Sequence, residues 1–136
     1  MDYSLEDFKK VIESESSLTR MGVNSLHTIR SYNKSSLDEA KEKLKFERES
    51  FLAHFNEFII CCEWLSIFKK VNTPQLSSYY LKHVVEKLAC ISISNGALIA
   101  AAIHLNIPIK YFSPSPNVNV AISKKCPCLK KAGIVV

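Results

Sequence analysis

Residues 93–107 read I-S-N-G-A-L-I-A-A-A-I-H-L-N-I, and this stretch decides how the rest of the chain can fold. Ser94 or Asn95 can cap the start of a helix, because a short side-chain oxygen accepts a hydrogen bond from a free N–H of the first turn. Asn106 can end that helix, since asparagine tolerates a left-handed backbone, and Pro108 blocks its continuation. Almost every position between the caps is apolar or small, so we expect a helix that is buried on all sides.

The length of the chain suits one domain. It has 136 residues, enough to bury a core without disulfide or metal support. Its 47% apolar and 23% charged residues are ordinary globular values, and its 3 glycines argue against glycine-rich phosphate loops. We divide this single domain into a short helix with a weakly defined segment (1–35), a core (36–123) and a basic tail (124–136).

The cysteines and the N-terminus predict a cytoplasmic protein. The chain has 5 cysteines, an odd number, and two of them (Cys61 and Cys62) lie in an apolar helical run. This pattern favours reduced, buried thiols. The first residues, M-D-Y-S-L-E-D, are acidic and show no signal peptide, and no run reaches the ~18 apolar residues of a membrane span. We expect no cofactor.

Two capping boxes predict helices in the first half of the chain. Ser4 with Asp7 opens a short helix over residues 3–12. The serine-rich stretch that follows, residues 13–34, permits a helical turn or two and predicts little else.

Ser36 with Glu39 opens the longest predicted helix, residues 37–70, in which Ser50 could mark a kink or break. Its first half is mostly charged and its second half is mostly apolar. One stripe of the second half has coiled-coil-like spacing and could be an intrachain core or a dimer interface. The stripe consists of Phe51, Phe55, Phe58, Cys62 and Leu65.

The second half of the chain predicts a helical corner followed by a hairpin. A helix over residues 79–89 is joined to the buried helix by a short connection, which gives a helix-turn-helix-like corner. Alternating apolar residues on both sides of S-P-S-P-N (113–117) predict a β-hairpin. We expect poor order after it, unless Ile134 to Val136 dock on the core. The fold class is therefore α+β and mainly helical: a helical bundle with this corner and a C-terminal β-hairpin.

Charge is distributed unevenly along the chain. Residues 1–86 carry 12 Lys and Arg against all 13 Asp and Glu, whereas residues 87–136 carry six lysines and no acid. A basic segment of this kind suggests a polyanionic partner, although a solvated lysine tail explains it equally well.

Nucleic-acid binding is the first functional hypothesis, because a helical corner, a hairpin and a basic tail have the outline of a winged helix. The buried helix has almost no polar side chains to offer a groove, so the helix over 79–89 or the hairpin would have to make the contacts. The candidate phosphate-binding residues are Lys82, His83, Lys87, Lys110, Lys124, Lys125, Lys130 and Lys131. The alternative is a homodimeric protein-interaction module without nucleic acid, with Phe51, Phe55, Phe58 and Leu65 at the interface.

Catalysis and metal binding have weaker signals. His83 and Glu86 share a helix face and could form an acid–base pair, and Ser92, Ser94 and the helix start could hold an anion. Surface pairing and helix capping explain the same residues. Cys126 and Cys128 lack a second pair at zinc-site spacing. We therefore assign no catalytic residue and no metal ligand.

Three pieces of the second half resemble short uncharacterised proteins of bacterial mobile genetic elements. These pieces are S-Y-Y-L-K-H-V-V-E (78–86), I-S-N-G-A-L-I-A-A (93–101) and N-V-N-V-A-I-S (117–123). The pattern has glycine where this chain has Cys90 and Asn106, and it does not extend to the N-terminal half. The resemblance implies a small bacterial accessory protein and no particular chemistry.

Overall fold

The computed structural model describes residues 2–133 and confirms a mainly helical α+β fold. None of the described helices is long and apolar enough to cross a membrane. In chain order the elements are α1 (Leu5–Ser14), α2 (Ser25–Asn33), α3 (Leu37–Ser50), the 3-10 turn η1 (Phe51–His54), α4 (Phe55–Ile67), β1 (Leu76–Ser77), α5 (Ser78–Ala89), α6 (Asn95–His104), β2 (Ile109–Tyr111), β3 (Val118–Val120) and α7 (Pro127–Lys131).

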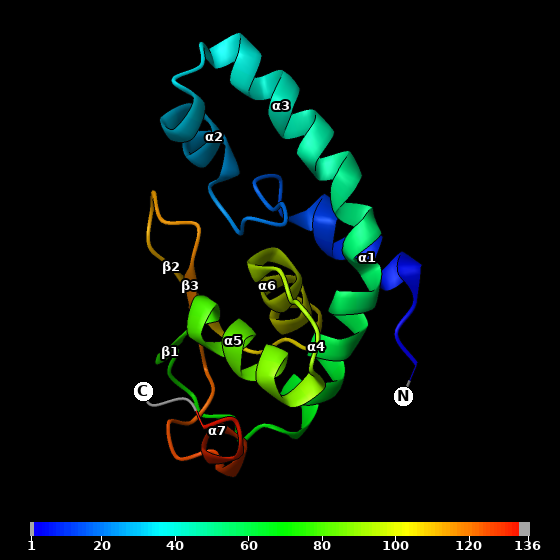
Figure 1. The fold of residues 1–136 in the computed structure, drawn as a ribbon, viewed down its shortest axis with the longest axis vertical. Coiled ribbons are helices and arrows are strands. Elements are labelled where there is room, and N and C mark those ends of the chain that lie inside the picture. Colours follow the sequence, from blue (N-terminus) through cyan, green and yellow to red (C-terminus); the bar gives the residue numbers. More distant parts are fainter. Residues whose placement is uncertain (1, 134–136) are drawn as a thin grey trace.

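Helix α6 is the centre of the core, as its sequence predicts. Ser94 caps it by accepting a hydrogen bond from the Ala97 N–H, and Asn106 follows its end with a φ of 58°. Residues 95–102 are all buried. Helices α1, α4 and α5 pack against it, so that α6 lies in the middle of the molecule (Figure 1).

The predicted hairpin is present and belongs to a larger sheet. Strands β2 and β3 pair antiparallel, with Lys110 opposite Asn119. Strand β1, which we did not predict, pairs antiparallel with the other edge of β3 and gives the order β1-β3-β2. A strand of two residues has no alternation for a sequence pattern to detect, so only its pairing partner defines it.

The predicted long helix is wrong as one element. The break falls at Ser50, the position at which the sequence indicated a kink or break. Helix α3 ends at Ser50, and the 3-10 turn η1 separates it from α4. A 3-10 turn has fewer residues per turn than an α-helix, so it changes which side chains face the core. Helix α3 buries only Ala40, whereas α4 buries most of its apolar stripe.

The apolar stripe lies inside the chain, which corrects the predicted dimer interface. Phe51, Phe58 and Leu65 are fully buried, and Phe55 is partly buried against the same core. The ring of Phe8 from α1 covers this stripe, with its centroid 5.0 Å from that of Phe51 and 4.7 Å from that of Phe58. Because α1 and α6 cover Phe51, Phe58 and Leu65, these three side chains present no surface to a second copy.

The serine-rich segment after α1 is ordered, through contacts that its own sequence does not reveal. Thr19 and Gly22 form a β-bridge, and α2 follows. The Arg48 guanidinium donates hydrogen bonds to the carbonyl oxygens of Ile12, Glu15 and Leu18 at 2.7, 2.8 and 3.0 Å. One side chain of α3 thereby ties down the end of α1 and the loop after it.

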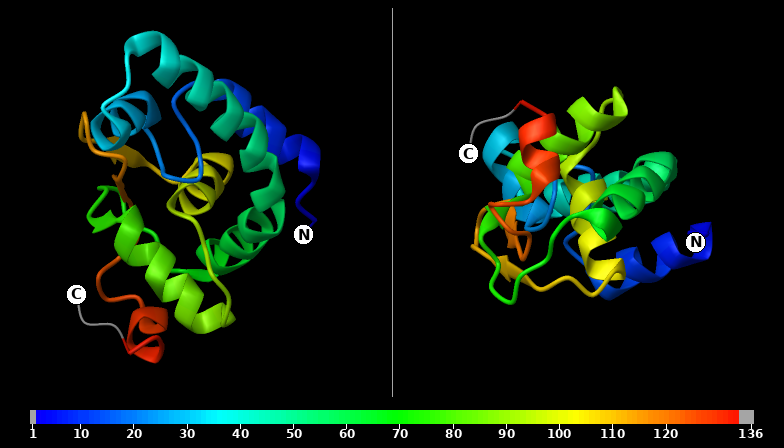
Figure 2. Two further views of the ribbon diagram at one scale, coloured as in Figure 1. Left: turned by 45° about the horizontal axis from the view of Figure 1, so that its top comes forward. Right: turned by 90° about the horizontal axis from the view of Figure 1, so that it is seen from below.

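The basic tail is also more ordered than predicted. Helix α7 turns Leu129 into the core, and the thiol of Cys126 is buried. The Lys69 N–H donates to Cys126 Sγ, and the Ser123 N–H donates to the Lys69 oxygen at 2.8 Å. The left view of Figure 2 shows α7 at one end of the molecule. The predicted docking of Ile134 to Val136 lies outside the described residues.

Candidate nucleic-acid interface

Residues 78–86, 93–101 and 117–123 meet in space. The Ser78 hydroxyl at the start of α5 accepts a hydrogen bond from the Val118 N–H of β3 at 3.1 Å. The Asn95 amide of α6 donates to Asn117 Oδ1 at 2.9 Å and also to the Met21 and Pro116 carbonyl oxygens. These side chains hold the corner and the hairpin together, so much of the motif is structural.

Lys82 and Glu86 fasten the turn between α5 and α6. Lys82 Nζ donates to the Ile93 carbonyl oxygen at 3.3 Å, and Glu86 Oε2 accepts from the Ile93 N–H at 2.9 Å. The two side chains also pair with each other at 3.6 Å, and that of Lys82 is only 15% exposed. Lys82 is therefore occupied within the protein, and we remove it from the proposed phosphate contacts.

The start of α6 does not offer the anion site that its sequence suggested. Two N–H groups at this turn already donate hydrogen bonds within the protein. The Ser94 N–H donates to Glu57 Oε1 at 2.6 Å, and the Gly96 N–H donates to the Arg20 carbonyl oxygen at 3.0 Å. A Cβ at Gly96 would lie 1.8 Å from the Thr19 oxygen, so the loop after α1 packs directly on this turn. The loop therefore fills the space beside Gly96, and the Ser94, Gly96 and Ala97 N–H groups already have acceptors.

His83 and Glu86 form the predicted pair on α5, with 2.8 Å between Nδ1 and Oε1. Burial raises the pKa of the Glu86 carboxyl, but the Ile93 N–H and the nearby Lys82 and His83 outweigh that effect and lower the pKa below its usual value. Glu86 is thus an ionised carboxylate that already has three partners. This arrangement suits an ion pair that fixes the corner better than a proton-transfer site.

A shallow depression of about 590 Å³ lies on the outer face of α5. Tyr79 is its most exposed aromatic residue, at 52%. The Tyr79 ring meets the His83 ring edge to face, with the centroids 4.6 Å apart, and Lys82 Nζ lies 5.2 Å from the Tyr79 centroid. Tyr80, Glu86 and Lys87 complete the lining.

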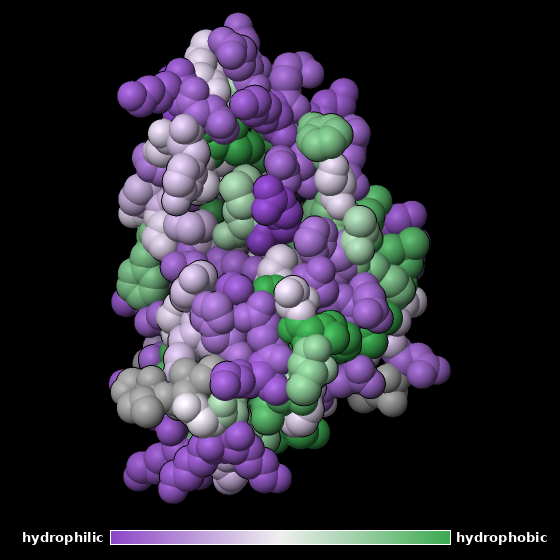
Figure 3. Space-filling model, viewed as in Figure 1, coloured by the Kyte–Doolittle hydropathy of each residue, from purple (hydrophilic) through white to green (hydrophobic). Residues whose placement is uncertain are grey.

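Lysines from two distant segments gather around α7. The contacts of Lys69 with Ser123 and Cys126 bring the end of α4 alongside the chain that leads into α7. Hydrophilic side chains gather at the lower tip of the molecule, next to hydrophobic ones (Figure 3). We call this group the lysine end; it consists of Lys69, Lys70, Lys124, Lys125, Lys130 and Lys131.

Sequence reasoning missed Lys69 and Lys70 in this group, because they looked like ordinary basic residues at a helix C-terminus. Burial lowers the pKa of Lys70. The Lys70 ammonium donates to the Ser66 oxygen. The other five ammonium groups have no ion pair among the described residues.

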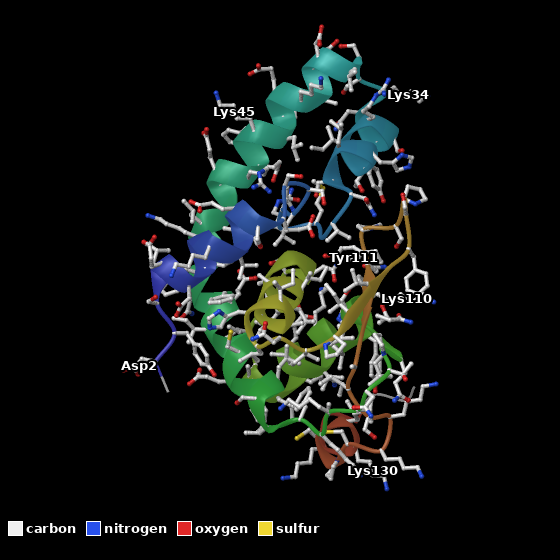
Figure 4. All side chains as sticks on the ribbon, turned by 180° about the vertical axis from the view of Figure 1, so that it is seen from behind. Asp2, Lys34, Lys45, Lys110, Tyr111 and Lys130 are labelled. Carbon is white, nitrogen blue, oxygen red and sulfur yellow. The ribbon has the colours of Figure 1, made fainter. Side chains whose placement is uncertain are left out.

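The predicted phosphate-binding residues therefore fall in three places. His83 and Lys87 lie on α5, and Lys110 lies on the edge strand β2 with its ammonium 5.4 Å from the Phe112 ring centroid. Figure 4 places Lys110 beside the sheet and Lys130 at the end of the molecule, well separated. The structure gathers the lysines of the tail and leaves Lys110 apart from them.

The cysteines are free thiols, and the two of α4, Cys61 and Cys62, are buried. Burial raises the pKa of the Cys61 thiol well above its usual value and that of Cys62 to about 12. Within residues 2–133, no group of three or more His, Cys, Asp or Glu side chains could hold a metal ion.

Comparison with protein-family models, with curated proteins and with solved structures gives no match to this chain.

Proposed function

We propose that the protein binds nucleic acid through the phosphate backbone, with the lysine end as its main contact. The observation that carries the proposal is the gathering of six lysines from residues 69–70 and 124–131 at one end of the molecule. Such a cluster costs electrostatic repulsion in the free protein, and a polyanion relieves that cost. Lysine contacts of this kind give affinity without sequence preference.

The connectivity of the core supports the same proposal. The order α4, β1, α5, α6, β2, β3, with the sheet order β1-β3-β2, is that of a winged helix. In that class the second helix of the corner enters the major groove. Here that helix is α6, whose residues 95–102 are buried, so direct reading of bases by α6 is excluded. Backbone contacts from the lysine end and the exposed face of α5 take its place.

The biological setting belongs to the same proposal. The resemblance supports a small accessory protein of a bacterial mobile element, and the free, high-pKa thiols of α4 suit a cytoplasmic protein. The homodimer alternative stays a prediction, and its original support is lost because Phe51, Phe58 and Leu65 are intrachain core residues.

A charge-neutralised variant tests the proposal. Fluorescence anisotropy with labelled single-stranded and duplex DNA at low salt should show binding by the wild-type protein. Changing Lys124, Lys125, Lys130 and Lys131 to Gln should weaken that binding at least a hundredfold, because each lost phosphate contact removes part of the electrostatic affinity.

The control variant carries the same change in net charge on α1 and α3, away from the lysine end. Lys10, Lys41, Lys43 and Lys45 changed to Gln also lower the formal charge from +5 to +1. That variant should bind nearly as well as the wild-type protein. Equal weakening by both variants would mean that net charge alone matters, and the lysine end would lose its assigned role.

A further inference from the structure

The depression on α5 presents an aromatic ring that phosphate binding does not require. Tyr79, His83 and Lys87 follow one another at intervals of four residues, so they line one face of the helix. The Tyr79 ring is half exposed although it is held in place by its contacts with His83 and Lys82. Lys82 is itself anchored on Ile93. The ring is therefore held in place while about half of the residue's surface is open to solvent.

The charge of this depression suits an anionic ligand. Its one acidic lining residue, Glu86, is paired with His83 at 2.8 Å and with Lys82 at 3.6 Å. Lys87 is exposed at the side of the depression. An incoming phosphodiester would meet no unpaired carboxylate among the lining residues. The surface offered is a tyrosine ring next to cationic groups.

We propose that this depression binds an unpaired nucleobase stacked on Tyr79, which makes the protein prefer single-stranded to double-stranded nucleic acid. A base inside a duplex is covered on both faces by its neighbours and cannot stack on the ring, whereas a base in a single strand can. The inference rests on the proposed function. It adds a second contact, of a different chemical kind, to the lysine end.

The placement of the two sites allows one strand to reach both. Helix α5 and helix α7 lie on the same face of the molecule in Figures 1 and 2. A basic surface that follows the backbone, combined with an aromatic side chain that stacks on a base, is the usual design of single-strand binding sites. Its stacking part tolerates any base, because every base has a flat face.

The test compares Tyr79→Ala and Tyr79→Phe with Tyr32→Ala, a control at another exposed tyrosine on α2. The probes are a 12-nucleotide single strand that contains 2-aminopurine and its duplex. Tyr79→Ala should weaken single-strand binding about tenfold or more and leave duplex binding unchanged. It should also abolish the change in 2-aminopurine fluorescence. Tyr79→Phe, which keeps the ring, and Tyr32→Ala should behave as the wild-type protein.

Three results would overturn the stacking site. Tyr79→Ala could bind the single strand as well as the wild-type protein, or it could lose single-strand and duplex affinity equally. In both cases the lysine-end variant would still test the proposed function separately. A wild-type protein that binds neither probe at low salt would remove the stacking site and the proposed function together. Because Tyr79 is half exposed, circular dichroism should show that all variants are folded.

Discussion

Two residues of the helical corner adopt a backbone conformation that their side chains disfavour. Cys90, after α5, and Asn106, after α6, both have a φ of 58°. Glycine adopts a positive φ without strain, so it would suit both positions. Asparagine tolerates this conformation better than most residues, and cysteine has no such advantage.

Replacing Cys90 with Gly should therefore stabilise the protein. The change relieves the left-handed strain of a side chain that is exposed, and we expect a gain of about 0.5–1 kcal/mol in the free energy of unfolding. Urea denaturation followed by circular dichroism measures it. The matched control is Ala89→Gly, one residue earlier in the helix, which should lose stability because its backbone is helical. A loss in both variants would contradict the strain at Cys90.

The helices and strands that depend on interactions between nearby residues could be predicted from the sequence. Helix α6, its caps and the hairpin followed from short patterns, because apolar periodicity and capping side chains act within a few residues. Strand β1, helix α7 and the ordered loop after α1 did not, since their partners lie far away in the chain. The loop depends on Arg48, and α7 follows a turn fixed by Lys69. For the same reason, the predicted phosphate-binding residues included the four lysines of residues 124–131 and not Lys69 and Lys70.

Arg48 offers the sharpest stability test of such a long-range contact. Arg48→Met keeps the apolar stem and removes three hydrogen bonds to carbonyl oxygens at the end of α1. We expect a loss of about 2–4 kcal/mol in the free energy of unfolding, because carbonyl groups in a part-buried site lose a charged donor. Arg30→Met, an exposed position on α2, should change it by less than about 0.5 kcal/mol. Similar losses in the two variants would contradict the anchoring role of Arg48.

The molecule as a whole has a core of fully buried residues and an uneven distribution of surface charge. The sheet has the order β1-β3-β2, and the second helix of the corner, α6, is buried over residues 95–102. Residues 69–133 carry nine lysines and a single acid, Glu86, which is paired internally. A protein of this kind should bind the nucleic-acid phosphate backbone with little preference for base sequence. Its affinity should depend strongly on salt concentration.

The salt dependence of nucleic-acid affinity tests the central claim most directly. For the wild-type protein, the logarithm of the association constant should fall linearly with the logarithm of salt concentration. Each phosphate contact contributes a slope of about −0.7 for a single strand. Changing Lys124, Lys125, Lys130 and Lys131 to Gln should make the slope shallower by about 3. The control variant, with Lys10, Lys41, Lys43 and Lys45 changed to Gln, should keep the wild-type slope. A slope that is the same in all three proteins, or no binding at low salt, would contradict a phosphate-binding lysine end.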